Sequence, residues 1–178
     1  VFIDGVFCAD LSSNELPDAI ALCRFGEASE EQSTRIQQYL NSALSQDVHL
    51  FAALNTATLR DGVFIDIPND YRGDAVIEVV SIAGAQTKPV VSNQRLLVLA
   101  GAGSQATVVE RFLSAGDPSA SSATGVSELL LSENACRKHF RIHEESGSAI
   151  HIGGVHTRLA RDARLESFHL ALGSELKR

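Results

Sequence analysis

The chain has little of the chemistry that fixes disulfide frameworks, closed metal centres or membrane anchors. Its 178 residues include only three cysteines, Cys8, Cys23 and Cys136. An odd number of widely spaced cysteines argues against a disulfide framework and against a closed zinc site, and it is typical of a reducing cytosol. No apolar run approaches the roughly 18 residues of a membrane span. We therefore expect a cytoplasmic protein whose cysteines are small packed hydrophobic residues.

Familiar catalytic motifs are also missing. The sequence contains no G-x-S-x-G, no P-loop and no G-x-G-x-x-G. A cupin would need a His-x-His pair with a following glutamate, but Arg141–Glu144 (RIHE) supplies one histidine. The aspartates of residues 61–74 do not cluster as the calcium site of a β-helix polysaccharide lyase would require. The residues by themselves predict no catalytic, cofactor-binding or metal site, so we expect no enzymatic activity.

Charge is distributed unevenly. The net charge is −7, but residues 1–134 carry 7 basic and 17 acidic side chains, whereas residues 135–178 carry 8 basic and 5 acidic ones. A chain this acidic, without interleaved basic and aromatic residues, is a poor nucleic-acid binder. We expect the basic C-terminal part to form a solvated face or a protein contact.

The length indicates one domain with a substantial core. Near its start, Ser29 and Gln32 form a capping box that predicts the beginning of a helix. A second helical stretch is predicted roughly from Val48 to Leu59. We therefore expect residues 1–60 to be a strand-turn and helical segment, and residues 61–178 to be β-structure.

Short apolar runs separated by small or polar turns dominate the rest of the chain. None is long enough for an ordinary helix, and several alternate with the period of two that a half-buried strand needs. The stretch Ser114–Gly125 between two of the runs is composed like a surface loop. The runs are Val63–Ile67, Asp74–Ile82, Arg95–Ala100, Ala106–Leu113, Val126–Leu131, Cys136–His143, Ala149–Val155 and Arg164–Leu172.

A weak internal period accompanies these runs. Ala106, Ala135 and Ala163 each stand at a turn exit, 28 to 29 residues apart. A period of about 20 to 50 residues is the signature of stacked supersecondary units. Two strands per repeat fit one flattened coil of a β-solenoid, in which neighbouring coils cover each other's apolar faces. An antiparallel meander would show the same alternation, so both remain open at this point.

Alternation within the strands predicts an orientation. We expect the aromatic and aliphatic side chains to face the interior and the histidines to face solvent. The predicted interior residues are Phe140, Ile142, Phe168, Leu170 and Leu172, and the predicted outward residues are His139, His143 and His169.

The histidines also suggest a metal site, but their spacing along the sequence argues against one. His139 and His143 would share one face of a strand but lie about 13 Å apart at about 3.3 Å per residue. His151 and His156 flank Gly153-Gly154, where a bulge could bring them together. We expect solvated histidines rather than ligands.

Four stretches follow one another in a recognisable order: Phe51–Asp70, Arg95–Phe112, Thr124–Ile142 and Arg164–Arg178. Together they resemble the SufB/SufD family of iron–sulfur cluster assembly proteins. The opening VFIDGVF (Val1–Phe7) looks like that of SufD, and Glu110 is followed by Arg111-Phe112 where a SufB would carry Gly-Cys. The SufD branch is therefore the better match.

The resemblance implies a right-handed parallel β-helix preceded by a short helical segment. It also implies a non-catalytic scaffold of a SufB–SufC–SufD complex, with a SufB-like paralogue or a second copy as one partner and a SufC-like ATPase as the other. The iron–sulfur cluster would be assembled transiently by the complex, without nucleic acid or membrane. The family's interface residues are expected beyond Arg178, so none is transferred to this chain, which looks cut from a longer protein. The alternative is a carbohydrate-active β-helix or a cupin-like metal-binding protein.

Overall fold

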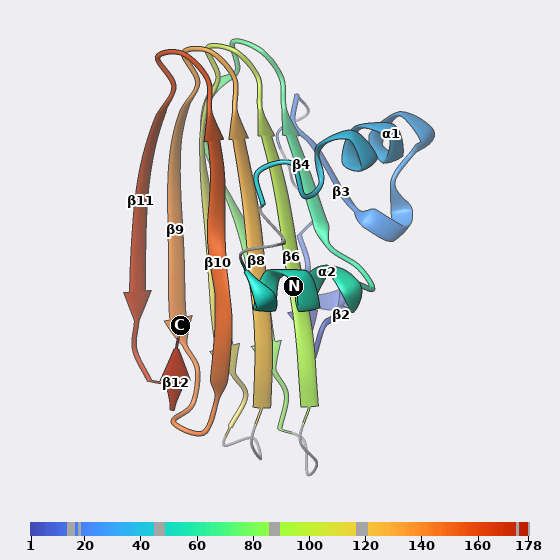
Figure 1. The fold of residues 1–178 in the computed structure, drawn as a ribbon, viewed down its shortest axis with the longest axis vertical. Coiled ribbons are helices and arrows are strands. Elements are labelled where there is room, and N and C mark those ends of the chain that lie inside the picture. The colour runs from blue at the N-terminus through green and yellow to red at the C-terminus, as the bar shows by residue number, and fades with distance from the viewer. Residues whose placement is uncertain are drawn as a thin grey trace.

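The computed structural model describes residues 1–13, 17, 19–44, 49–85, 90–116, 121–173 and 175–177. Two six-stranded sheets face each other (Figure 1). One sheet has the order β11-β9-β7-β5-β1-β2, formed by Arg164–Ala171, Cys136–Glu144, Gln105–Ser114, Arg72–Ala83, Phe2–Ile3 and Val6–Phe7. The other has the order β12-β10-β8-β6-β4-β3, formed by Leu176–Lys177, Ile150–Leu159, Ser121–Leu131, Val90–Ala100, Val63–Ile67 and Ala21–Arg24.

Each sheet forms one face of a solenoid, because the chain alternates between the two sheets strand by strand. β5, β7, β9 and β11 are mutually parallel, and so are β4, β6, β8 and β10. This confirms the predicted mainly β solenoid and rules out the antiparallel meander. The strands that contain or follow the three periodic alanines, β7, β9 and β11, stack in parallel, as a solenoid requires.

The alanine period is only partly correct. Gln105 pairs with Cys136, which pairs with Arg164, so the residues that precede them correspond: Ser104, Ala135 and Ala163. Ala106 instead pairs with Arg137. Ala106 therefore lies two residues beyond Ser104, the true equivalent of Ala135 and Ala163. The difference arises because the coil from Ser104 to Ala135 is longer than the coil from Ala135 to Ala163.

Each coil turns at one edge through four residues. The third residue of each turn has a positive φ: Asp70 (56°), Gly103 (65°), Asn134 (57°) and Asp162 (58°). Aspartate, asparagine and glycine are the residues that tolerate this left-handed conformation best. The turns hydrogen-bond to one another, since Gly103 N donates to Glu133 O at 2.9 Å and Asn134 N donates to Arg161 O at 3.1 Å.

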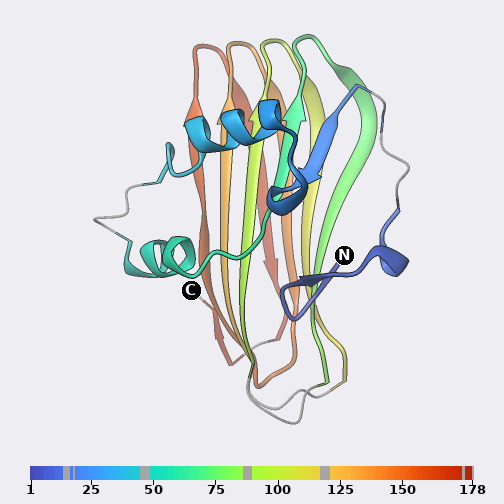
Figure 2. The same ribbon diagram turned by 90° about the vertical axis from the view of Figure 1, so that its right-hand side faces the viewer.

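Two helices lie on the outer face of the second sheet (Figure 2). α1 (Glu30–Tyr39) begins with the predicted capping box, in which Ser29 and Gln32 each accept a hydrogen bond from the other's backbone N–H. Short 3-10 helices span Ala9–Leu11 and Phe25–Glu27. α2 (Leu50–Ala57) is shorter than predicted, and the expected start at Val48 lies outside the described residues. No helix among the described residues is both long and apolar enough to cross a membrane.

Residues 1–60 do not only precede the solenoid but also contribute strands to it. β1 pairs in parallel with β5, and β3 pairs antiparallel with β4, so this segment extends both sheets. The domain boundary near residue 60 stays a prediction.

An apolar core fills the part of the solenoid interior next to the four-residue turns. Residues from both sheets meet there because every second side chain of a strand points inward. The buried members are Ile20, Val63, Ile65, Ile67, Ile77, Leu96, Val98, Ala100, Ala106, Val108, Leu129, Leu131 and Ala135.

The predicted orientation of the strands β9 and β11 is wrong. His139 and His143 are buried, whereas Phe140 is only half-buried and Phe168 is 54% exposed. The rings of Phe140 and Phe168 lie next to each other, 6.4 Å apart, on the outer face. Ile142 and Leu170 are likewise half-buried, and Leu172 is exposed. His169 shares the inward register but is exposed.

Two further expectations need correction. The stretch Ser114–Gly125 is not all loop, because residues 121–125 belong to β8 and Thr124 is buried; residues 117–120 lie outside the described residues. The basic C-terminal part is not simply a solvated face, because Arg137 and Arg141 are buried inside the solenoid. Both errors arise because polar residues enter the interior of the later coils.

Candidate functional site

The interior of the solenoid changes from apolar to charged along its axis. In one inward-facing column of paired residues, Val79 is followed by Glu110, Arg141 and His169 in successive coils. In the neighbouring column, Ser81 is followed by Phe112, His143 and Ala171. Parallel in-register pairing thus collects ionisable side chains at one level of the interior.

Glu110 lies at the centre of the first polar cluster. Its carboxylate accepts hydrogen bonds from the Ser127 hydroxyl at 2.7 Å and from His139 Nε2 at 2.8 Å, and Arg141 Nε lies 3.9 Å from it. Burial alone would raise the pKa of Glu110. The charge of Arg141, followed by the hydrogen bond and charge of His139 and the Ser127 hydroxyl, outweighs burial and lowers that pKa to about 2. Glu110 is therefore a buried carboxylate that stays ionised.

Arg141 connects this cluster to the rest of the interior. Its Nη2 donates to the Gly125 carbonyl oxygen at 2.9 Å, and its guanidinium carbon lies 5.0 Å from the centre of the Phe112 ring. A Cβ at position 125 would lie 2.5 Å from Arg141 Nη2 and 2.7 Å from His151 Nε2. Glycine is needed here because two interior side chains close in on the backbone.

His143, Glu145 and His151 form a second buried cluster. His143 Nδ1 donates to Glu145 Oε2 at 3.1 Å, and His151 Nδ1 donates to Glu145 Oε1 at 3.0 Å. Phe112 stacks on His143, with ring centroids 4.4 Å apart and planes 17° apart, and meets His151 edge-on at 4.7 Å. The two imidazoles are themselves 4.6 Å apart and nearly perpendicular. Three potential metal ligands are thus held together in one fixed arrangement.

A cavity of about 280 Å³ adjoins both clusters. Its lining includes Arg141, His143, His151, His169 and the small Gly153. Burial lowers the pKa of His169, and the charges of Arg141 and His139 lower it further. The cavity gives a small ligand access to the imidazoles.

Arg137 is the exception among the interior charges. It is 0% exposed, and within the described residues none of its three guanidinium nitrogens has a hydrogen-bond partner. Burial lowers the pKa of its guanidinium to about 10.

A separate ionic network fixes the helical segment to the outside of the sheet. Arg95 Nη2 and Glu128 Oε1 form a fully buried pair at 2.5 Å. Glu128 also accepts backbone hydrogen bonds from Asn41 N at 2.8 Å and from Ala43 N at 3.0 Å. Asn55 of α2 bonds to Thr124 and to Arg95. Every partner belongs to the chain, so we interpret this network as structural.

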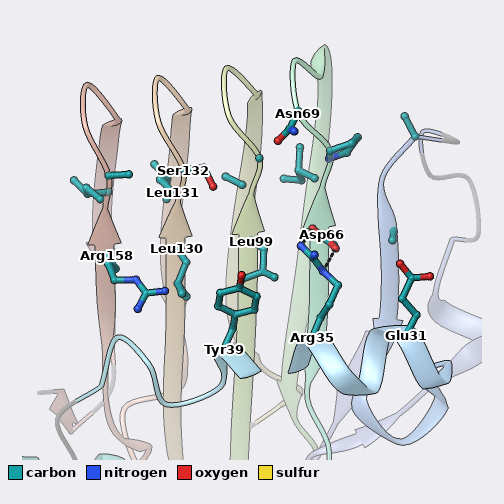
Figure 3. A pocket seen from close by; sticks show the side chains of 18 residues that line it. Glu31, Arg35, Tyr39, Asp66, Asn69, Leu99, Leu130, Leu131, Ser132 and Arg158 are labelled. Atoms are coloured by element: carbon teal, nitrogen blue, oxygen red, sulfur yellow. Dashed lines mark hydrogen bonds and ion pairs between the residues drawn. The ribbon is translucent and has the colours of Figure 1, made fainter. Parts of the chain in front are cut away.

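A groove of about 780 Å³ lies between α1 and the turn-side end of the second sheet (Figure 3). Arg35 and Asp66 form an ion pair across it, with Nε 2.6 Å from Oδ2. Tyr39, Leu99 and Leu130 lie beside it, and Arg158 extends from β10. The groove combines a charged end with an apolar wall, and at the charged end Arg35 and Asp66 pair with each other.

The metal hypothesis for His151 and His156 is not supported by the backbone. β8 and β10 pair without a register shift through this stretch, so no bulge brings the two rings together. His151 is buried inside, whereas His156 lies outside against His49, with ring centroids 5.2 Å apart. The three cysteines are half-buried and unpaired in disulfides. Cys136 precedes the inward-facing Arg137 and therefore points outward.

Sequence reasoning missed both clusters because it assigned ionisable residues to solvent. A buried charge is costly unless it is paired. Here His139 meets Glu110, and His143 and His151 both meet Glu145. Two signals were available. Glu110 and His139 stand 29 residues apart, which is about one coil, and His143, Glu145 and His151 follow one another in the pattern H-x-E-x5-H.

The fold and its charged interior define a β-solenoid protein with a built polar site. A family model described as "SUF system FeS cluster assembly, SufBD core domain" matches residues 81–178, and one described as "SufBD protein N-terminal region" matches residues 1–79. The chain therefore belongs to the SufBD family of iron–sulfur cluster assembly proteins.

Two curated relatives match the chain along its whole length. The iron–sulfur cluster assembly SufBD family protein slr0076 of Synechocystis sp. is 27% identical over 186 residues, which cover 100% of this chain and 41% of the relative. The chloroplastic protein ABCI7 of Arabidopsis thaliana is 26% identical over 185 residues, covering 100% of this chain and 38% of the relative. The chain thus spans about two fifths of the length of these relatives.

Proposed function

We propose that this chain is a SufD-like, non-catalytic scaffold component of a SufB–SufC–SufD complex that assembles iron–sulfur clusters. The observation that carries the proposal is the residue two positions after Glu110. It is Phe112, which is only 2% exposed and fills the interior between the histidines. A SufB-like chain is expected to carry a cysteine there. Proteins hold iron–sulfur clusters mainly through cysteine thiolates. The outward position of Cys136 supports a chain that needs a partner to complete cluster chemistry.

The partners follow from this assignment. The proposed complex pairs the solenoid with a SufB-like paralogue, or with a second copy, and adds a SufC-like ATPase. The cluster is a transient product of the complex and not a resident cofactor of this chain. We place this work in the cytoplasm, in agreement with cysteines that form no disulfide.

The alternative of a carbohydrate-active or cupin-like protein has weaker support. Among the described residues, the grouped potential metal ligands are His143, Glu145 and His151. Neither the aspartates of residues 61–74 nor a His-x-His pair belongs to this group.

The test is reconstitution with the full-length protein that contains this chain. It is mixed under anaerobic conditions with SufB-like and SufC-like proteins of the same organism, iron, sulfide and reductant, and cluster absorbance is recorded. We expect a stoichiometric cluster only with the SufB-like partner present, and a stable complex on size-exclusion chromatography.

The control variants are Cys136→Ser and Cys23→Ser, which should leave assembly unchanged because both thiols lie outside the interior. A stoichiometric cluster on the isolated protein, lost in one of these variants, contradicts the scaffold role. Failure to associate with either partner contradicts the complex.

A further inference from the structure

The His143–Glu145–His151 cluster has the composition of a metal centre. Two imidazoles and one carboxylate are the protein ligands of zinc hydrolases and also of non-haem iron(II) enzymes. Both kinds of site use three protein ligands and leave at least one position open. We propose that these three residues bind one divalent first-row transition-metal ion, such as Fe²⁺ or Zn²⁺, inside the solenoid. This departs from the sequence expectation that the chain has no metal site.

The spacing of the donor atoms fits a single ion. One ligand atom from each residue lies within 4.8 Å of the others, and each histidine Nδ1 is 3.0 or 3.1 Å from a carboxylate oxygen. Metal–ligand bonds of about 2.0 to 2.2 Å in tetrahedral geometry separate neighbouring ligands by about 3.3 to 3.5 Å. An ion therefore fits after each donor moves by less than about 1 Å. Binding at Nδ1 would require each neutral imidazole to carry its proton on Nε2 instead.

The rings are already oriented by their surroundings. Phe112 stacks on one imidazole and meets the other edge-on, and the two imidazole planes are 88° apart. Packing against Phe112 therefore fixes the positions of both rings before an ion binds. The cost of ordering the ligands is therefore largely met by packing, which favours metal affinity.

The charge and access of the site also favour a cation. With neutral imidazoles the three ligands carry one negative charge, which Glu145 supplies in a buried position. Among the described residues, Arg141 is a nearby cation, and its Nε lies 3.9 Å from Glu110. The 280 Å³ cavity touches His143 and His151, so water or another small ligand can complete the coordination.

The rival interpretation is a hydrogen-bonded His–Glu–His triad that only stabilises the fold. The two can be separated because hydrogen bonding tolerates a neutral amide where metal coordination needs a carboxylate. The inference does not depend on the proposed complex, since it concerns three side chains of this chain alone.

The experiment is an anaerobic titration of the full-length metal-free protein with Co²⁺, followed by competition with Zn²⁺ and Fe²⁺. We expect visible ligand-field absorption of a four- or five-coordinate Co²⁺ site at one equivalent, displaced by either metal. Glu145→Gln and His151→Gln should each weaken Co²⁺ binding at least about tenfold. Far-UV circular dichroism of the metal-free variants shows whether they fold; if one does not, the other and His143→Gln carry the test.

The matched controls are His156→Gln and His139→Gln. The first removes the outer His49–His156 pair, and the second removes a buried histidine that binds Glu110 instead. Both should keep the one-equivalent site. Binding that disappears in His156→Gln, or that is unchanged in folded Glu145→Gln and His151→Gln, overturns the proposal. So does a folded wild-type protein that binds no Co²⁺ at micromolar concentration.

Discussion

The two ends of the strands enclose different interiors within one backbone fold. Near the four-residue turns, the side chains of Ile65, Val98 and Leu129 pack with those of Ile77 and Val108. Farther from these turns, Glu110, Arg141 and three His–carboxylate contacts replace them. The strands pair in the same way in both regions, so strand pairing does not decide whether an interior side chain is apolar or charged. The apolar region supplies stability, while the polar region holds side chains that can bind a ligand or exchange a proton.

The first test of this difference removes a large side chain from the apolar region. Leu129→Ala removes a fully buried side chain and should lower the free energy of unfolding by about 3 to 4 kcal/mol. Phe140→Ala is the control, because this larger side chain points outward and is half-buried; it should cost about 1 kcal/mol. Urea unfolding measures both, and equal losses would contradict the orientation seen here.

Acid should act selectively on the polar region. The pKa of Glu110 is about 2 in the folded protein against 4.5 ordinarily, so its contribution is complete above about pH 4.5 and is lost as pH falls toward 2. The linkage amounts to about 3 kcal/mol. In Glu110→Gln this part of the pH dependence should vanish. The measurement is urea unfolding between pH 2 and 5, and an unchanged slope in the variant contradicts the assignment.

Arg137 provides a further test, because it is a charged residue placed beside the apolar region. An unpaired buried charge destabilises the folded state. Arg137→Met should therefore raise the free energy of unfolding by about 1 to 3 kcal/mol. Arg161→Met, at an exposed surface ion pair, should change it by less than about 0.5 kcal/mol. A destabilised Arg137→Met would show that the guanidinium is needed.

The smallest effect is expected at the four-residue turns. Asp70→Val and Asp162→Val place a β-branched residue at a positive φ in an early and in a late turn. Each should cost about 1 to 2 kcal/mol. Thermal unfolding compares them, and a marked difference between the two would mean that the turns do not contribute equally.

Much of the fold could be predicted from the sequence, but its interior could not. Alternation located the strands, and the Ser29 capping box located a helix start, because both signals are local. The orientation of β9 depends on partners one coil away: His139 is buried because Glu110 meets it, and no rule of hydrophobicity places Phe140 outside. The candidate site was missed for the same reason, since His143 and His151 need Glu145 to be buried together.

Every turn at one edge contains four residues, yet 33, 31 and 28 residues separate Asp70, Gly103, Asn134 and Asp162. The differences are absorbed outside the four turn residues, as in β5, where the five residues from Arg72 to Val76 lie opposite the three from Gln105 to Thr107. This bulge lies directly beside a four-residue turn, whereas the second difference lies at the opposite edge, between the pairs Leu113–Glu144 and Ser122–Ile150. A change in coil length at either edge can therefore leave the columns of interior side chains aligned.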